Sequence, residues 1–268
     1  MKQELVSVIM PTYNTGKFLS ESIECVLNQT YTNLELMIAD DGSTDNTRDI
    51  LEHYKSKDPR VKVFYLERNQ GAGPARNKCI KEAQGQYIAF CDSDDRWMPE
   101  KLEKQIAFLR ERKCGLTYAS YILCDENNQE KGIFIAPKVV TYAGMLRDDK
   151  IGCLTAVYDV KAVGEKFYLP SLRKRQDWAM FIMLLKKCRV AYGMKEPLAY
   201  YRLRQNSISS NKFALVHYNA RVYQEMLGFS PLRSYLFLFT FFLPTYAIKM
   251  IKRKYDSFMY MRNKHAKE

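Results

Sequence analysis

Three short segments place an aromatic ring or carboxylates directly after an apolar run. Residues 11–13 (PTY) close the first run, Asp40 and Asp41 follow the second, and residues 92–95 (DSDD) follow the fourth. In such a set a ring can stack on a base, one carboxylate can accept from a base N–H, and the others can hold a divalent ion that neutralises a diphosphate. The segments therefore predict a site for a nucleoside diphosphate and a metal ion.

Each acidic segment also has a simpler interpretation. An Asp-Ser-Asp run often only solvates a strand end or caps the next helix, and Asp40 and Asp41 can form an N-terminal cap cluster instead. We favour a metal and ribose site at residues 92–95, because they come directly after a buried-strand pattern. For Asp40 and Asp41 we favour the base pocket.

The elements that must position these segments follow an alternating pattern. We predict strands at residues 6–10, 34–39, 61–66 and 87–91, and helices at 18–27, 43–54, 74–83 and 99–112. This alternation predicts an α/β fold, a Rossmann-like and mostly parallel sheet flanked by helices. Ligands bind at the carboxyl ends of strands in such sheets, so the three segments would meet at one edge.

The second half of the chain has a looser pattern. Residues 121–135 carry a polar turn between two apolar flanks, which favours a hairpin, and residues 176–188 form a strong helical pattern. The simplest partition is one α/β domain over residues 1–205 and a helical, apolar and basic extension over residues 206–268.

Charge and hydropathy separate this extension from the rest. The chain of 268 residues has 42 Lys and Arg against 30 Asp and Glu, a net charge of +12, and its 47% apolar content excludes a disordered or fibrous protein. Residues 212–268 hold ten of the basic groups and three of the acidic ones, beside an uncharged run at 234–248. As a helix this run would extend about 22 Å, less than the roughly 30 Å of a hydrocarbon core, so we do not expect a clean single span.

We predict instead that residues 230–268 associate with an anionic membrane surface, with aromatic and apolar side chains in the interface and cations beside them. The alternative is a buried helix with a solvated basic tail. Nucleic-acid binding is not expected, because no recognition motif accompanies the charge. The pattern leaves the oligomeric state open.

The seven cysteines and the first residues bear on the compartment. The cysteines are scattered without a C-x-x-C spacing, so neither a disulfide framework nor a structural zinc site is expected. The chain starts with a polar stretch and lacks the pattern of a signal peptide. We therefore expect a cytosolic protein.

Four ordered motifs resemble the signatures of family 2 inverting glycosyltransferases with the GT-A fold, of the type that builds bacterial cell-surface polysaccharides. The motifs are VIMPTYN (8–14), DDGSTD (40–45), GPARN (73–77) and YIAFCDSDD (87–95). The resemblance extends over about residues 5–205.

The resemblance implies a role for individual residues. Tyr13 would stack on uracil, Asp41 would accept from its N3–H, Asp40 would support that loop, and Arg76 would approach the diphosphate or ribose. Asp94, together with Asp92, would bind Mn²⁺ or Mg²⁺. The complete nucleotide-sugar site would comprise Pro11, Thr12, Tyr13, Asp40, Asp41, Arg76, Asp92, Ser93, Asp95, Arg202 and Arg204.

A general base is also implied, at the start of a helix late in the domain. Asp177 occupies that position, although Gln176 stands where Glu is frequent in the family. Its carboxylate would take the proton of the acceptor hydroxyl in a single in-line displacement. Asp177 could equally cap the helix. Trp97 and Trp178 have apolar faces suited to an acceptor sugar, or they are structural.

The implied activity is transfer of a sugar from a UDP-sugar to a hydroxyl of a glycan acceptor, lipid-linked and presented at the cytosolic face of the membrane. Two alternatives stay open at this point. One is transfer to a polyprenyl phosphate, and the other is a non-catalytic, nucleotide-binding peripheral membrane module.

Overall fold

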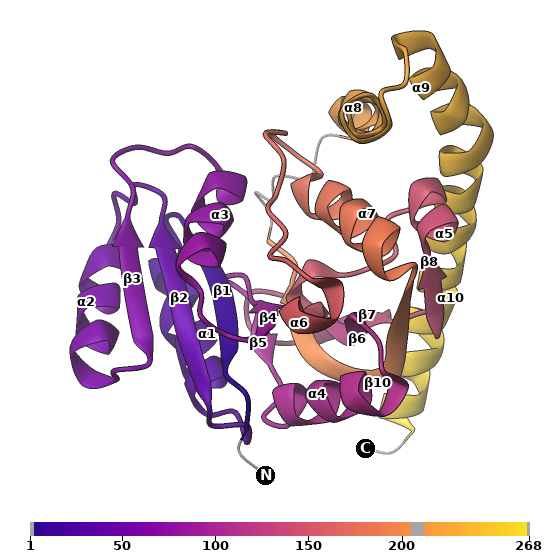
Figure 1. The fold of residues 1–268 in the computed structure, drawn as a ribbon. Helices are drawn as coiled ribbons and strands as arrows, with labels where there is room; N and C mark the ends of the chain where they lie inside the picture. Colours follow the sequence, from indigo (N-terminus) through magenta and orange to yellow (C-terminus); the bar gives the residue numbers. More distant parts are fainter. Residues whose placement is uncertain (1–2, 205–211, 267–268) are drawn as a thin grey trace.

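The computed structural model describes residues 3–204 and 212–266. It contains a mixed sheet with helices on its faces, and Figure 1 shows α2 and β3 at one end of the molecule and α10 at the other. The strands are β1 (Val6–Thr12), β2 (Leu34–Asp40), β3 (Val61–Tyr65), β4 (Tyr87–Phe90), β5 (Arg96–Trp97), β6 (Leu116–Cys124), β7 (Glu130–Phe134), β8 (Val139–Thr141), β9 (Val157–Asp159) and β10 (Val190–Arg202).

The helices alternate with the strands in the first half and gather at the end of the chain. They are α1 (Gly16–Leu27), α2 (Thr47–Lys57), α3 (Ala72–Glu82), α4 (Lys101–Arg112), α5 (Tyr142–Arg147), α6 (Val160–Val163), α7 (Gln176–Cys188), α8 (Lys212–Leu227), α9 (Pro231–Phe237) and α10 (Leu243–His265). Two irregular turns complete the list, the 3₁₀ turn η1 (Cys153–Thr155) and the π-helical turn η2 (Leu238–Phe242).

The sheet changes character along its width. Its first four strands lie in the order β3-β2-β1-β4 and are all parallel, as the alternating pattern predicts. Next comes β9, which is antiparallel to both β4 and β6, and β10 is parallel to β6 but antiparallel to β5 and β8. The α/β fold with flanking helices is confirmed, whereas the second half of the sheet is mixed rather than mostly parallel.

Two apolar cores lie on the two faces of this sheet. Every residue of β1 is buried, and alternate side chains enter different cores: Ile9 joins one cluster with Met37, while Val8 and Met10 join the other. Burial on both faces is typical of parallel strands covered by helices. The strands that carry the acidic segments are thereby fixed at the centre of the molecule.

The predicted hairpin and late helix are confirmed. β6 and β7 form an antiparallel pair across the polar turn, and α7 has the bounds that its periodicity predicts. The long strand β10 has no counterpart among the predicted elements. Its pairing with β6 shifts register at Pro197, because proline cannot donate to the ladder, and this irregularity masks the strand in the sequence.

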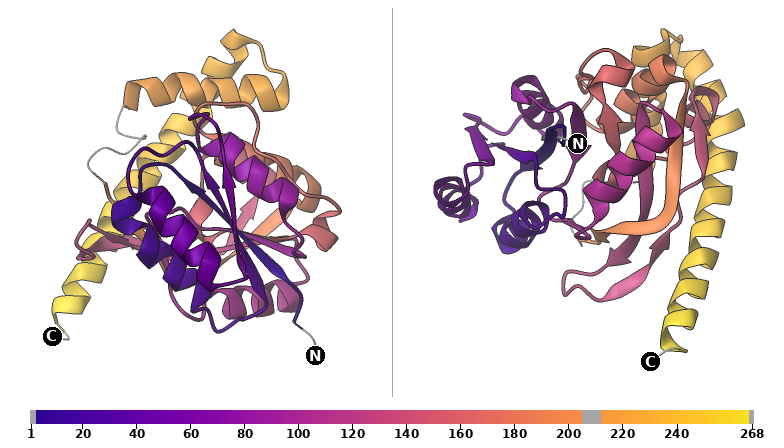
Figure 2. Two further views of the ribbon diagram at one scale, coloured as in Figure 1. Left: turned by 90° about the vertical axis from the view of Figure 1, so that its left-hand side faces the viewer. Right: turned by 60° about the horizontal axis from the view of Figure 1, so that its bottom comes forward.

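The extension packs against the rest of the chain. The indole ring of Trp178 on α7 lies 5.6 Å from the ring of Tyr223 on α8 and 5.1 Å from that of Phe242 in η2. From α9 through η2 to α10 the backbone is one helical run along the outer side of the molecule (Figure 2). The π-helical turn precedes Pro244, which lacks an N–H, so the proline does not end the run.

Candidate active site

The loops after β1 and β2 are held together by Asn14. Its backbone N–H donates to Oγ of Ser43 over 2.9 Å, and its side-chain Oδ1 accepts from the N–H of Thr44 over 2.8 Å. Asn14 has a φ of 49°, a left-handed conformation that asparagine tolerates better than most residues. The neighbouring Tyr13 is 44% exposed, so its ring is available at the strand end for stacking.

Asp40 and Asp41 are both buried, and each carboxylate organises a different loop. Asp40 accepts from the N–H of Ser43 over 3.1 Å and from Nε of Arg48 over 2.9 Å. Asp41 accepts from the N–H groups of Gln70 and Gly71 over 2.8 and 2.7 Å, which anchors the segment before α3. Burial raises the pKa of Asp41, although both N–H bonds oppose the shift. The contact of Asp41 with uracil stays a prediction.

A chain of buried hydroxyls links the first loop to the acidic loop after β4. The hydroxyls of Thr12 and Thr15 are 2.6 Å apart, and Oγ1 of Thr15 donates to Oγ of Ser93 over 3.1 Å. Thr12 and Ser93 are therefore positioned by each other's loops. Pro11 lies beside them at the buried end of β1, opposite Ala39 of β2.

Arg76 reaches from α3 to the acidic loop. Its Nη2 lies 2.5 Å from Oδ1 of Asp92, and the guanidinium is almost completely buried. Burial lowers the pKa of Arg76, but the charges of Asp92, Cys153 and Asp177 raise it by more, so the net shift is upward. Asp92 and Asp177 therefore both lie close enough to act on the same guanidinium, although they come from opposite halves of the domain.

Arg202, at the end of β10, holds the acidic loop in place through hydrogen bonds to Asp94 and Asp95. Its N–H donates to Oδ1 of Asp95 over 2.9 Å, its Nε donates to the carbonyl of Asp94 over 2.9 Å, and its Nη2 pairs with Glu21 of α1 over 2.6 Å. Both Arg202 and Asp95 are buried, and burial raises the pKa of Asp95 well above its usual value.

Two predicted roles change as a result. Direct contacts of Asp95 with the donor sugar and of Arg202 with the diphosphate do not fit this structure, because both side chains are buried in contacts that shape the loop. Arg204 differs, since its guanidinium is one-third exposed and pairs with Oδ2 of Asp94 over 3.1 Å. Arg204 therefore remains a candidate for the diphosphate.

The chemistry of Asp92 and Asp94 fits a divalent cation. Burial raises the pKa of Asp94, and the charge of Asp92 raises it further, so a cation between them would relieve the repulsion. Among the described residues no group of three or more His, Cys, Asp or Glu side chains could enclose a metal ion. Two carboxylates suit Mg²⁺ or Mn²⁺ when the diphosphate supplies further ligands.

Asp177 lies in the first turn of α7, and the residue before that helix has unusual geometry. Arg175 has a φ of 64°, which is rare outside glycine and asparagine, and its Nη1 lies 3.3 Å from Oδ2 of Asp149. Burial raises the pKa of Asp149 to about 7, and the charge of Asp177 adds to the rise. The predicted base is thus near a second carboxyl group.

The second carboxyl group is connected to the C-terminal helix. Nζ of Lys249 on α10 lies 2.5 Å from Oδ1 of Asp148 and donates to the carbonyl of Asp149 over 2.6 Å. Cys153 also lies in this region. Burial raises the pKa of its thiol, the charge of Arg76 opposes the shift, and the charges of Asp92, Asp177 and Asp149 add to it.

We did not identify these residues from the sequence. Because they lie near the predicted base Asp177, they are called the acceptor side below. The adjacent Asp148 and Asp149 were a visible carboxylate pair, but they follow the short helix α5 rather than one of the predicted strands. Their link to Lys249 spans about one hundred residues, a separation that no local motif can encode.

The two tryptophans do not contact an acceptor in this structure. Trp97 is 4% exposed and Trp178 is fully buried. Their indole N–H groups donate to the carbonyls of Leu154 and Met145, each over 2.8 Å. The prediction that these rings stack on a sugar is therefore wrong for this conformation, because both rings belong to the two apolar cores.

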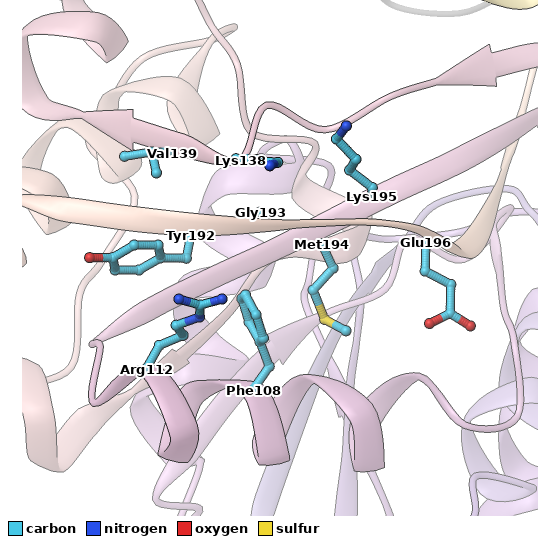
Figure 3. Close-up of a pocket in the computed structure, with 9 residues that line it drawn as sticks. All are labelled: Phe108, Arg112, Lys138, Val139, Tyr192, Gly193, Met194, Lys195 and Glu196. Carbon is cyan, nitrogen blue, oxygen red and sulfur yellow. The ribbon is translucent and has the colours of Figure 1, made fainter.

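A cavity of about 510 Å³ lies away from all these residues. Figure 3 shows it between α4 and β10, where Phe108 and Arg112 face Tyr192 and Met194. None of the predicted site residues lines it. The acidic edge of the sheet, with Asp177 opposite, remains the candidate active site.

Comparison with known proteins identifies the family of this chain. Residues 7–158 match Glycosyl transferase family 2. The chain is 46% identical over 223 residues to the putative teichuronic acid biosynthesis glycosyltransferase TuaG of Bacillus subtilis, covering 83% of this chain and 88% of that protein. It is 42% identical over 215 residues to an Escherichia coli protein, UDP-Glc:alpha-D-GlcNAc-diphosphoundecaprenol beta-1,3-glucosyltransferase WfgD, covering 80% and 83%.

The fold comparison leads to the same assignment. The crystal structure of S. aureus TarS residues 1–349 in complex with UDP-GlcNAc superposes with a TM-score of 0.70 at 24% identity, covering 88% of this chain and 73% of that one. The match at this identity supports the fold, and the sequence relatives support the family. This chain belongs to Glycosyl transferase family 2.

Proposed function

We propose that this protein transfers a sugar, glucose or a related hexose, from its UDP-activated form to a hydroxyl of a glycan linked to a polyprenyl diphosphate, with inversion at the anomeric carbon. The observation that carries the proposal is that buried Arg76 of α3 pairs with Asp92 of the acidic loop, while Gln176, next to Asp177 at the start of α7, lies against Gly73 at the start of the same α3. The named activity of the E. coli relative supports the donor and the acceptor class. The product would serve the synthesis of a cell-surface polysaccharide.

The donor would bind across the first three loops. Tyr13 would stack on uracil, and the loops fixed by Asp40, Asp41 and the hydroxyl chain would shape the pocket around it. Arg204 would pair with the diphosphate through charge-assisted hydrogen bonds. Asp92 and Asp94 would hold Mn²⁺ or Mg²⁺, and such an ion, when bound, neutralises the leaving diphosphate.

Asp177 would take the proton of the attacking hydroxyl. It lies in the first turn of α7, and its Oδ1 accepts from the N–H of Trp178 over 2.9 Å. Its carboxylate can accept the proton as the new glycosidic bond forms.

The donor, metal and acceptor are tested together by one transfer assay. The assay supplies UDP-glucose and GlcNAc-diphosphate on a short lipid, with Mn²⁺, Mg²⁺ or a chelator, and detects the disaccharide product. We expect a metal-dependent product with an inverted linkage. The same assay is repeated with a lipid phosphate and with other lipid-linked sugars as acceptors. If UDP-glucose is hydrolysed and none of the acceptors receives a sugar, the proposal is contradicted.

We also place the protein at the membrane surface, by residues 230–268. One helix among the described residues, Pro231–Lys264, is long and apolar enough to cross a membrane by length and composition, and it extends well beyond the run 234–248 that was expected to be too short for a span. An orientation in the plane of the surface is favoured, because Ser257 bonds to Ile133 and Lys264 pairs with Glu130 along the inner side of the helix.

The outer side of the same helix is apolar. From α9 through η2 to α10 the exposed apolar side chains are Leu232, Leu236, Phe239, Phe241, Ile248, Ile251, Tyr255 and Phe258. From residue 248 onward they recur every three or four residues and so share one face, and the cations Lys252 and Lys254 are exposed nearby. Such a stripe suits the interface of an anionic leaflet.

Point variants test this surface better than a truncation, because deletion after Ser230 would also remove Phe242 from the Trp178 core. We expect Ile251→Ser with Phe258→Ser to reduce sedimentation with phosphatidylglycerol vesicles. The matched control, Val139→Ser with Tyr168→Ser, changes exposed apolar side chains elsewhere. Equal sedimentation of the two double variants would contradict the assignment.

A further inference from the structure

A groove of about 180 Å³ separates α10 from the segment around β7 and β8. Phe134, Pro137 and Ile248 provide an apolar floor, and Lys150, Lys252 and Arg253 provide positive charge. The groove therefore combines the two chemistries of an anionic lipid head, a site for phosphate oxygens and a site for hydrocarbon.

The positive charge of this groove is only partly neutralised. Lys249 and Asp148, which also line it, are paired with each other at 2.5 Å. Asp256 is the other carboxylate in the lining. Within residues 3–204 and 212–266, the other three cations of the lining, Lys150, Lys252 and Arg253, form no ion pair within 4.0 Å. Their three positive charges exceed the single negative charge of Asp256 by two. An arginine in this set suits phosphate oxygens, which match the planar fork of its donors.

The groove adjoins the acceptor side of the active site. Asp148 lines it, and the next residue, Asp149, is the carboxyl group that interacts with Asp177. The ring of Tyr121 stacks on Phe134 at 4.8 Å, and the charges of Arg253, Asp149 and Asp95 all reach its hydroxyl. Figure 1 shows α5, which precedes Asp148, between α7 and α10.

The apolar part of the groove continues onto the proposed membrane surface. Ile248 lines the groove and is 68% exposed, and Ile251, one turn further along α10, is 70% exposed. A hydrocarbon chain that leaves the groove would therefore pass directly onto the apolar stripe. A free nucleotide or inorganic phosphate would use the cations but not this stripe.

We propose that this groove binds the diphosphate and first isoprene units of the lipid-linked acceptor. Lys150, Lys252 and Arg253 donate to the phosphate oxygens, and the hydrocarbon leaves along Ile248 and Ile251. The acceptor sugar then extends past Asp149 toward Asp177. This assignment rests on the proposed function, and it identifies which residues recognise the lipid-linked part of the substrate.

The test compares two charge-matched double variants of the full chain. Lys252→Gln with Arg253→Gln removes two groove cations, whereas Lys186→Gln with Arg262→Gln removes two exposed cations, on α7 and α10, that do not line the groove. Each is assayed with GlcNAc-diphosphate on a short lipid and with GlcNAc on the same lipid without the diphosphate. Binding of farnesyl diphosphate, farnesol and inorganic pyrophosphate is measured by calorimetry.

The groove variant should raise KM for the diphosphate acceptor about tenfold or more and leave KM for UDP-glucose and for the neutral acceptor unchanged. It should also weaken farnesyl diphosphate binding, while the control variant behaves as wild type. Equal KM values in both variants, equal losses on the neutral acceptor, or pyrophosphate binding as tight as farnesyl diphosphate would overturn the groove assignment. Absence of any transfer by the wild-type protein would instead refute the proposed function.

Discussion

The donor side and the acceptor side of the site differ in how their buried polar groups are satisfied. In the loops after β1 and β2, the carboxylates of Asp40 and Asp41 accept from backbone N–H groups. On the acceptor side Oδ2 of Asp148, Oδ1 of Asp149 and Nε of Arg175 are buried with no hydrogen-bond partner among the described residues. Buried polar groups are nearly always paired in folded proteins, so such exceptions need an explanation.

The difference suggests that the two sides are completed by different groups. The loops after β1 and β2 are completed by the chain itself, because they begin at the ends of strands held by the parallel ladder, although Nε of Arg76 on α3 is also buried with no partner among the described residues. The acceptor side is built from short elements, α5 and η1, and from contacts with α10. We interpret its unpartnered groups as places that a bound acceptor, or water in its absence, would satisfy.

The largest expected effect separates the chemical step from donor binding. Asp177→Asn keeps the shape of the side chain but removes the proton acceptor. We expect kcat to fall by about 10³-fold, within the usual range for a lost general base, while calorimetry gives an unchanged Kd for UDP. Near-normal kcat with a hydroxyl acceptor would show that the base lies elsewhere.

The next effect contrasts the buried and exposed arginines of the donor side. Arg202→Ala removes the donor to the carbonyl of Asp94 and one of the two arginines paired with Glu21, so we expect about 2 kcal/mol less stability, within the range for lost hydrogen bonds of a charged group. Arg204→Ala should change Tm little, because an exposed pair contributes at most about 1 kcal/mol, but raise KM for the donor. Denaturant unfolding and donor kinetics measure both. Similar unfolding curves for the two variants would remove the distinction.

A smaller effect concerns uracil. Tyr13→Ala removes an exposed ring whose stacking should contribute about 1–3 kcal/mol, the range measured for bases on aromatic side chains. We expect UDP to bind about tenfold more weakly, and Tyr13→Phe to bind it as wild type does. If Tyr13→Phe loses as much affinity as Tyr13→Ala, the hydroxyl rather than the stacked face makes the contact.

A different kind of effect probes the acceptor side through pH. The pKa of Asp149 is about 7 in the folded protein and near 3.8 when unfolded, so its contribution to stability is present below pH 4 and is lost as the pH rises to about 7. Asp149→Asn cannot ionise, and the difference in Tm between variant and wild type should therefore shift in favour of the variant between pH 4 and 7 and stay constant above. Asp49→Asn, at an exposed position of α2, is the control. A difference in Tm that does not vary with pH would show that Asp149 is ionised throughout.

The sequence predicted the positions of the donor-side segments for a physical reason. Residues 11–13, 40–41 and 92–95 are contiguous in the chain, and a parallel sheet brings the ends of its strands together without further information. The helix over residues 176–188 was equally predictable, because its apolar face follows a regular period. Position along a strand or helix was enough for these parts.

The acceptor side could not be predicted in this way. Asp149, Cys153 and Lys249 come together only through the packing of α5, η1 and α10. The sequence also did not reveal which of these side chains are buried. Trp97, Trp178 and Arg202 are of types that often bind ligands, but the two tryptophans lie in the apolar cores and Arg202 holds the acidic loop. Pro244 predicted an interruption of the apolar run, and the π-helical turn before it preserved one long helix.

The contact of Trp178 with Tyr223 and Phe242 has a practical consequence for chimeric enzymes. Because one ring is shared by the helix that carries Asp177 and by two later helices, a graft joined near residue 205 would divide a single packing unit between two parents. Exchange of acceptor preference between relatives would then require the partners of position 178 to be transplanted together with the tail. A crossover before α7 keeps Trp178 with Tyr223 and Phe242, at the expense of the contact between Phe90 and Phe181.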